Sequence, residues 1–147
     1  MSISIAHLVE RFRDIHEQRM QGLPFINAKL SVEAVGFRSW KNLELGVLIT
    51  PWFMNLILLP TSEAEVEQGH KIAARFPSGN IELTAAQDEE LGLYFSAALF
   101  SSVMQFPNQE TAVDIAAEIM RELFDAKRNA RFVSRRALLT AKGHADA

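Results

Sequence analysis

Near the start of the chain, apolar side chains recur at helical spacing. Those on one side of a 3.6-residue period are Ile5, Leu8, Val9, Phe12, Ile15 and Met20. Ser2 or Ser4 is placed to cap this segment, and Gly22 is placed to end it. We therefore predict an amphipathic helix. Its polar face is expected to consist of Glu10, Arg11, Arg13, Asp14, Glu17 and Gln18.

A pattern of period two begins after a linker that contains Pro24, and it predicts a strand over Val32–Arg38. Within Leu45–Pro60, two apolar runs flank Pro51 and Trp52, which predicts a hairpin with its turn at these two residues. Apolar residues occupy both faces of this hairpin. We expect its strands to be central, covered from both sides or from one side plus a partner.

The following segment predicts a second hairpin, in which His70–Phe76 and Ile81–Thr84 flank the turn Pro77–Asn80. An acidic turn at Asp88–Glu90 then leads to Leu91–Phe100, where apolar residues alternate as in a strand. These segments add further antiparallel strands to the sheet.

A second amphipathic helix is predicted after Pro107, with Asn108 as its cap. Its buried face is expected to hold Val113, Ala116, Ala117, Ile119, Met120, Leu123 and Phe124. Its outward residues are expected to be Glu110, Asp114, Glu118, Arg121 and Glu122. A capping-box pattern also predicts a short helical turn over Glu63–Gln68.

This order of elements predicts a single α+β domain. An antiparallel sheet of about five to six strands would be flanked by an N-terminal and a C-terminal amphipathic helix. The domain is expected to occupy residues 1–126, and residues 127–147 form a basic tail for which disorder is one expectation.

Composition narrows the class of protein. The chain has 147 residues, 48% of them hydrophobic, and its lack of cysteine excludes disulfides, thiolate metal sites and a cysteine nucleophile. Glu10 and Arg11 interrupt the N-terminal segment, so it does not resemble a secretory signal. The uncharged run Leu45–Pro60 is shorter than the ~20 residues of a membrane helix. We expect a cytoplasmic protein without membrane insertion.

Charge is unevenly distributed along the chain. The net charge is −3, but residues 127–147 contain six basic residues and one acidic residue, so this tail carries +5 and the remainder carries −8. Binding to nucleic acid requires a basic surface that neutralises phosphates. The anionic body therefore argues against a nucleic-acid partner.

No pattern of catalytic or ligand-binding residues stands out. The four histidines lack metal-ligand spacing, and the chain has no nucleophile-elbow, phosphate-loop or dinucleotide-binding glycine motif. Ser101 and Ser102 have no candidate base nearby in the sequence, and the carboxylates of Glu63–Glu67 and Asp88–Glu90 lie in polar turns where solvation is expected. We predict no metal, no cofactor and no enzyme activity.

Two aromatic residues occupy the predicted tip of the central hairpin, where side chains are usually exposed. Trp52 either folds back onto the core or, with Phe53, forms an apolar contact patch for a partner protein. Phe106 and Pro107, at the start of the second helix, raise the same question.

Three segments of the chain occur in an informative combination. They are GVLITPWFMNLILLP at Gly46–Pro60, the turn Phe76–Gly79, and GLYFSAALFS at Gly92–Ser101 before the closing helix. This combination resembles the HybE family of [NiFe]-hydrogenase assembly chaperones, and the resemblance covers Gly22–Phe124. It implies a cytosolic accessory protein of a membrane-bound uptake hydrogenase. Such proteins are thought to hold precursor subunits back from twin-arginine export until their metal clusters are in place, and no enzyme activity is implied.

The resemblance thus predicts a chaperone for a [NiFe]-hydrogenase precursor, most readily the small subunit with its twin-arginine signal peptide. The expected contact residues are Pro51, Trp52, Phe53, Phe76, Pro77 and Phe106. Two alternatives stay open: a small-ligand binder or enzyme of unknown reaction, and a structural subunit of a larger complex. A homodimer is also left open.

The basic tail contains Ser-Arg-Arg-Ala-Leu-Leu at Ser134–Leu139. This string resembles the twin-arginine signal core, Ser-Arg-Arg-x-Phe-Leu, but lies at the wrong end of the chain to act as a signal. One interpretation is a basic amphipathic tail. The other hypothesis is mimicry of the client's signal by Arg135, Arg136, Leu138 and Leu139, either in the chaperone's own groove or at the export machinery.

Overall fold

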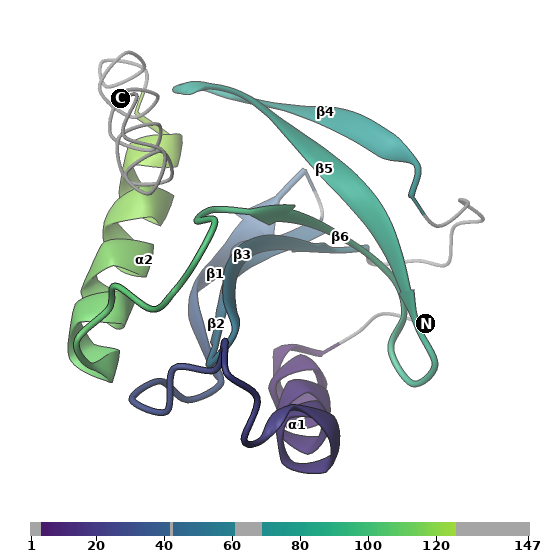
Figure 1. Ribbon diagram of the computed structural model, residues 1–147. Helices are drawn as coiled ribbons and strands as arrows, with labels where there is room; N and C mark the ends of the chain where they lie inside the picture. The colour runs from purple at the N-terminus through teal and green to yellow at the C-terminus, as the bar shows by residue number, and fades with distance from the viewer. Residues whose placement is uncertain (1–3, 42, 61–68, 126–147) are drawn as a thin grey trace.

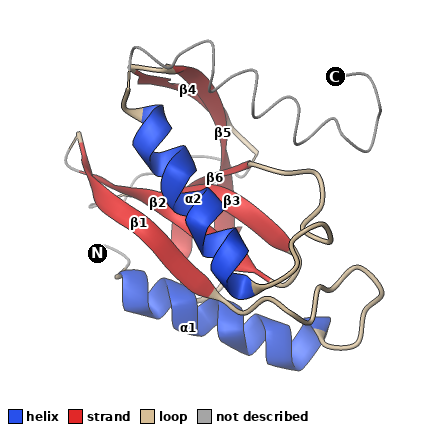
Figure 2. Cartoon of the chain, turned by 90° about the vertical axis from the view of Figure 1, so that its left-hand side faces the viewer, coloured by secondary structure: helices blue, strands red, loops and turns tan. Residues whose placement is uncertain are grey.

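The computed structural model describes residues 4–41, 43–60 and 69–125 of the chain. These residues form helices on both faces of an antiparallel sheet (Figures 1 and 2). The helices are α1 (Ile5–Ile15), its continuation as a π-helical turn η1 (His16–Met20), and α2 (Gln109–Leu123). The strands are β1 (Glu33–Trp40), β2 (Leu43–Thr50), β3 (Phe53–Leu59), β4 (Lys71–Phe76), β5 (Gly79–Asp88) and β6 (Gly92–Ala98).

The sheet is assembled from antiparallel hairpins in the order β1-β2-β3-β6-β5-β4. Strands β3 and β6 pair although β4 and β5 lie between them in the sequence, so the β4–β5 hairpin occupies the far edge. The predicted α+β architecture, with an antiparallel sheet and a helix towards each end of the chain, is confirmed.

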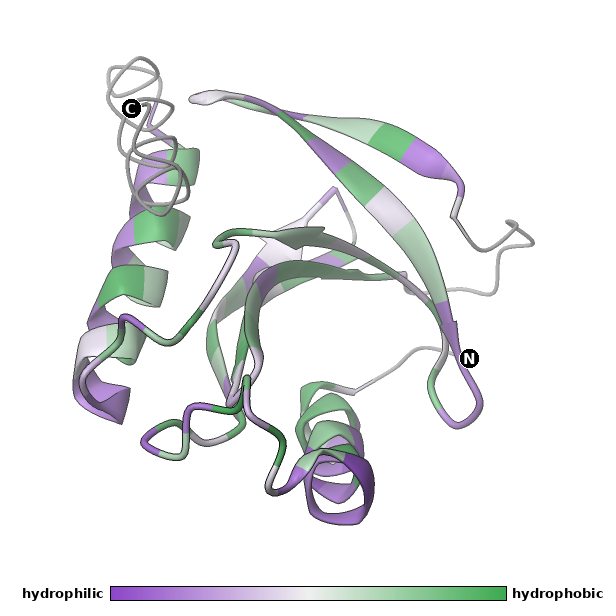
Figure 3. Cartoon of the chain, viewed as in Figure 1, coloured by the Kyte–Doolittle hydropathy of each residue, from purple (hydrophilic) through white to green (hydrophobic). Residues whose placement is uncertain are grey.

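Both helices begin at predicted caps. The hydroxyl of Ser4 accepts the N–H of His7 at 3.0 Å, and the side-chain oxygen of Asn108 accepts the N–H of Thr111 at 2.8 Å. Each bond satisfies one backbone donor that the first helical turn leaves free. Figure 3 shows that each helix turns its hydrophobic side toward the sheet and its hydrophilic side outward.

The central hairpin β2–β3 is buried on both faces, as predicted. The face toward α2 carries Leu45, Val47, Ile49, Met54, Leu56 and Leu58, which join the apolar residues of α2 in one core. The opposite face carries Leu48, Ile57 and Leu59, which form a second core with Leu8 and Phe12 of α1. Thr50 pairs with Phe53, so Pro51 and Trp52 form the turn.

A bulge in β1 assigns its side chains to the two cores. The pairing with β2 shifts between Val35 and Arg38, and Gly36 in this bulge has a φ of +68°, a conformation that glycine adopts without strain. Because of the extra residue, Phe37 lies on the face of the sheet toward α1, whereas Val35 and Trp40 lie on the face toward α2.

The two edge strands meet on the α2 side of the sheet. The ring centroids of Trp40 in β1 and Phe76 in β4 lie 4.8 Å apart, so the sheet curves until side chains of its first and last strands are in contact. Phe124, just after α2, packs on Phe76 at 5.7 Å, and the N–H of Ser78 donates to the carbonyl of Leu123. Figure 1 shows the β4–β5 turn beside the C-terminal end of α2.

The outward assignment of Glu122 is wrong, because its side chain is 2% exposed. The last turn of α2 docks against the β4–β5 turn instead of lying on the surface, so its flank is enclosed as well. Ala112, which the predicted buried face omits, is also buried. The predicted helical turn Glu63–Gln68 and the tail 127–147 lie outside the described residues.

Gly46 provides a test of this packing, because the ring of Phe37 lies directly on its backbone. A Cβ atom at Gly46 would lie 2.2 Å from Cδ1 of Phe37. We expect Gly46→Ala to destabilise the fold by about 1–3 kcal/mol, as overpacked cores do. In a Phe37→Ala background the same change should become neutral or stabilise by about 0.5–1 kcal/mol, since alanine suits a strand better than glycine. Urea denaturation of the wild type, the two single variants and the double variant measures the free energy of unfolding of each. If Gly46→Ala lowered this free energy equally with and without Phe37, the predicted clash would be contradicted.

Candidate functional site

The turn between β2 and β3 is a rigid corner. The buried hydroxyl of Thr50 accepts the N–H groups of Trp52 at 3.2 Å and Phe53 at 3.0 Å, and it donates to the carbonyl of Phe53 at 3.4 Å. Pro51 has no N–H to satisfy, and its carbonyl accepts the N–H of Asn27 at 2.8 Å. The side chains of this turn therefore project in fixed directions.

Trp52 folds against α1 and remains partly exposed. Its ring stacks on His16 with centroids 5.9 Å apart and lies 6.3 Å from the ring of Phe12. Phe53 packs edge-on against Phe12 at 5.5 Å, and Tyr94 of β6 approaches Phe12 at 6.4 Å. The turn thus caps the α1-side core with an aromatic cluster whose outer edge reaches solvent.

The other expected contact residues lie elsewhere. Phe76 and Phe106 are buried in the α2-side core, where they pack on Trp40 and Phe100 respectively. Pro77 is exposed, but it lies at the β4–β5 turn beside the end of α2. The structure therefore brings together only the residues of the β2–β3 turn, and neither buried ring is available to a partner in this conformation.

Asn27 holds three separate segments together at this corner. Its side-chain amide donates to the carbonyls of Val103 and Phe106, both at 3.0 Å, while its backbone N–H reaches Pro51. The loop 21–32, the β2–β3 turn and the loop 99–108 are thereby fixed against one another. Sequence reasoning missed this residue, because its partners are distant in the chain.

The large apolar side chains that the described residues leave exposed gather on these two loops. They are Leu23, Phe25 at 52% exposure and Met104 at 53%, and we refer to them as the apolar rim. The signal that could have found them is the absence of charge, since no charged residue occurs from Met20 to Ala28 or from Leu91 to Gln109.

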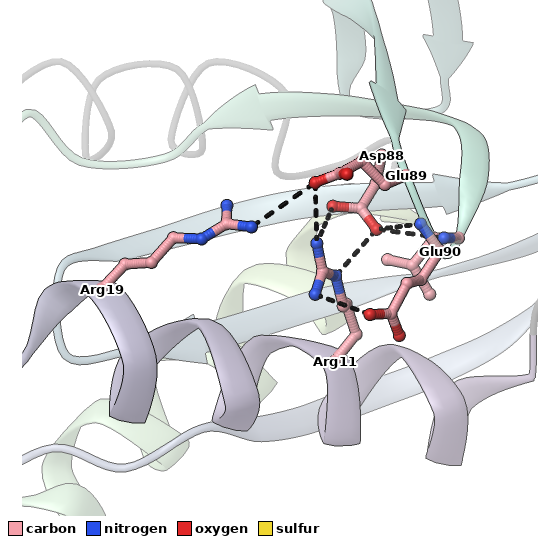
Figure 4. Close-up of polar contacts among 6 residues, drawn as sticks. Arg11, Arg19, Asp88, Glu89 and Glu90 are labelled. Atoms are coloured by element: carbon pink, nitrogen blue, oxygen red, sulfur yellow. Dashed lines mark hydrogen bonds and ion pairs between the residues drawn. The ribbon is translucent and has the colours of Figure 1, made fainter.

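An ion-pair network ties α1 to the β5–β6 turn (Figure 4). Arg11 is 5% exposed, and its guanidinium donates to both carboxylate oxygens of Asp88 at 2.9 and 3.2 Å and to Glu90 at 3.0 Å. Arg19 approaches Glu89 at 3.5 Å on the surface. The expectations that Arg11 faces outward and that Asp88 is solvated are therefore wrong. Each residue was assigned from its local surroundings, whereas the partner that allows its burial lies 77 residues away.

The geometry keeps Asp88 ionised. Partial burial by itself raises the pKa of Asp88, but hydrogen bonds from Arg11 and from the backbone N–H groups of Glu90 and Leu91 outweigh it, so the pKa is lowered overall. Burial, with the nearby charge of Asp88, raises the pKa of Tyr94.

Within residues 4–41, 43–60 and 69–125, no three His, Cys, Asp or Glu side chains are grouped so that they could hold a metal ion. Nor does this part of the chain contain a helix long and apolar enough to cross a bilayer. What it does present at its surface is the partly exposed Trp52, the apolar rim and the exposed carboxylates of Glu89 and Glu90.

Comparison with known families decides the assignment. Residues 4–141 match the model of the family described as "[NiFe]-hydrogenase assembly, chaperone, HybE". The chain belongs to this family. The matched range is wider than the segment Gly22–Phe124 that carries the resemblance, since it takes in α1 and most of the basic tail.

Two relatives illustrate the similarity of this HybE family member to known proteins. It is 40% identical over 126 residues to the hydrogenase expression/formation protein HoxT of Azotobacter vinelandii, an alignment that covers 84% of this chain and 82% of HoxT. It is 41% identical over 129 residues to the probable rubredoxin HupJ of Rhodobacter capsulatus, covering 86% of this chain and 46% of HupJ. The chain thus spans about half the length of that relative.

The HybE fold is also seen in a solved structure. The solution structure of HybE from Escherichia coli matches with a TM-score of 0.56 at 18% identity, covering 93% of this chain and 76% of that one. At this identity the likeness shows a shared fold.

Arg11 allows a direct test of the tie between α1 and the β5–β6 turn. We expect Arg11→Ala to destabilise the HybE domain by about 1.5–3 kcal/mol, since it removes buried charge-assisted hydrogen bonds. The matched variant Arg19→Ala loses only an exposed pair and should cost less than ~1 kcal/mol. Because the pKa of Asp88 is lowered on folding, the contribution of Arg11 should be complete above pH ~4 and shrink as Asp88 protonates in acid. Urea denaturation at pH 7 and in acid measures both effects, and equal costs for the two variants would contradict the buried tie.

Proposed function

We propose that this protein is a chaperone that binds a precursor subunit of a [NiFe]-hydrogenase in the cytoplasm. Its client is the small subunit with its twin-arginine signal peptide, which it keeps from export until the cofactor has been assembled. The observation that carries the proposal is the family match over residues 4–141. The hydrogenase expression/formation names of its relatives support it.

Electrostatics favour a basic client segment. Residues 1–126 carry a net charge of −8, which would steer a positively charged peptide toward the domain. The β5–β6 turn also illustrates how this fold accommodates arginine, since Asp88 and Glu90 already hold the guanidinium of Arg11. Arginine pairs suit such a surface because the guanidinium makes bidentate bonds with carboxylates.

The contact would centre on the exposed edge of Trp52, with Phe53 beside it and Pro51 fixing the turn. A partly exposed tryptophan on a rigid turn loses little entropy on binding. Phe76 and Phe106 are buried, so their part in the proposal is to support the fold. Pro77 is exposed but lies away from this corner.

The first experiment is co-purification with tagged hydrogenase precursors. We expect the protein to retain the precursor small subunit, and to lose it when the signal peptide is removed. Trp52→Phe should weaken binding about three- to tenfold, whereas Trp40→Phe, on the α2 face, should not. Circular dichroism checks that both variants fold. Retention of no precursor subunit would rule out the proposed function, and equal effects of the two variants would remove Trp52 from the contact.

The tail hypothesis is proposed with its own test. If Arg135, Arg136, Leu138 and Leu139 occupy the client site, the tail competes with the client at high effective concentration. Deleting Arg131–Ala147 should then tighten binding of a twin-arginine signal peptide by about tenfold, as should Arg135→Gln combined with Arg136→Gln. Fluorescence anisotropy measures the affinity. An unchanged affinity rejects self-occupancy.

A further inference from the structure

The apolar rim leaves a third to a half of the surface of three large apolar side chains in contact with solvent in the described part of the chain. Single exposed apolar residues are common on protein surfaces. Here, however, the exposed large apolar residues of the described chain all lie on two loops that Asn27 fastens together. Such clustering on one part of a surface is typical of an interaction site.

Hydrogen bonds hold the rim in place. The side-chain oxygen of Asn27 accepts the N–H of Lys29 at 3.0 Å, and Gln109 of α2 accepts the N–H of Ser31 at 2.9 Å. On the second loop, the N–H of Met104 donates to the hydroxyl of Ser102 at 3.1 Å. Because the loops are already ordered, binding a partner would cost little additional entropy.

The surroundings of the rim indicate which kind of segment fits. Leu91–Gln109 contains no charged residue, and the loop 21–32 contains only Lys29. An apolar segment without charges could therefore settle on the rim without burying an unpaired charge, which would be costly. A positively charged segment would find no acidic partner among these residues.

Helix α1 with its continuation η1 connects the acidic β5–β6 turn to the loop that carries Leu23 and Phe25. Met20 accepts the N–H of Leu23 at the end of η1, and Arg11, nine positions earlier, contacts Asp88 and Glu90. At ~1.5 Å per helical residue Arg11 and Met20 are about 13 Å apart along the helix axis, a distance that an extended peptide spans with about four residues. Glu89 and Glu90 are 81% and 57% exposed, so their carboxylates remain accessible to a further cation.

We propose that the apolar rim seats the uncharged apolar stretch of the client's signal peptide, with the arginine pair that precedes this stretch directed toward Glu89 and Glu90. This assignment rests on the proposed function and adds the location and the direction of the bound segment. Along α1 the acidic turn, beside Arg11, comes before the apolar rim, which follows Met20. Along such a peptide the arginine pair likewise comes before the apolar stretch. A client guanidinium would displace Arg19, which holds Glu89 only through an exposed contact.

The test uses a synthetic peptide in which an arginine pair precedes an uncharged apolar stretch. We expect the double variant Phe25→Ser, Met104→Ser to bind it at least about tenfold more weakly than the full-length wild type. The matched variant Asn80→Ser, Gln87→Ser alters exposed uncharged residues on β5 and should bind as the wild type does. Replacing the apolar stretch of the peptide with serine and glycine should abolish the difference between the variants.

The direction in which the peptide binds is measured with a nitroxide label on one end of the peptide or on the other. A label on the apolar end should broaden the NMR signals of Phe25 and Met104, and a label on the arginine end those of Glu89 and Glu90. The reverse pattern would overturn the proposed direction.

The outcomes separate this inference from the proposed function. Wild-type affinity in the rim variant, while the wild type still retains the precursor, places the contact elsewhere and leaves the function standing. A rim variant that changes from dimer to monomer in sedimentation identifies the rim as a self-interface and overturns the assignment. Failure of the wild type to bind either peptide or precursor counts against the proposed function itself.

Discussion

The burial of the β2–β3 hairpin on both of its faces is the constraint on which this structure depends. Strands with apolar side chains above and below must be covered twice, and one layer of helix covers only one side of a sheet. Helix α2 supplies the cover on one face and α1 on the other. The remaining strands extend the sheet on either side of this pair until its edges meet through Trp40 and Phe76.

The position of α1 follows from this requirement and creates the features of the candidate site. Leu8 and Phe12 cover the second core, which brings Arg11 to the β5–β6 turn and His16 to Trp52. One helix therefore links an acidic turn to an aromatic corner. The loop that follows α1 returns to the sheet at Asn27, which binds both the β2–β3 turn and the loop before α2. The same packing that stabilises the core thus fixes the distance between apolar and acidic parts of the surface.

A chaperone of the HybE family has to recognise another polypeptide. Recognition of this kind requires preformed apolar surface and complementary charge. The chain places large apolar groups on anchored loops whose sequence contains Lys29 as its one charged residue, and it leaves the carboxylates of Glu89 and Glu90 exposed. The chain has no cysteine, so it supplies no thiolate ligand of its own.

The sequence by itself determined the elements of this protein. Period and capping residues predicted both helices, with Ser2 or Ser4 as the cap of the first and Asn108 as the cap of the second. They also predicted the hairpin turn at Pro51 and Trp52 and the α+β class, because all of these depend on neighbours within a few residues. The motif around Trp52 also pointed to the family. Tertiary structure alone decided which charged residues are buried. Arg11 and Asp88 had the local surroundings of solvated residues, and Glu122 those of an outward helix position, yet each is enclosed by segments far away in the chain. For the same reason Phe76 and Phe106 became core residues and the rim of Leu23, Phe25 and Met104 became surface. Whether a side chain is buried depends on which distant segment packs over it, and local periodicity cannot predict that segment.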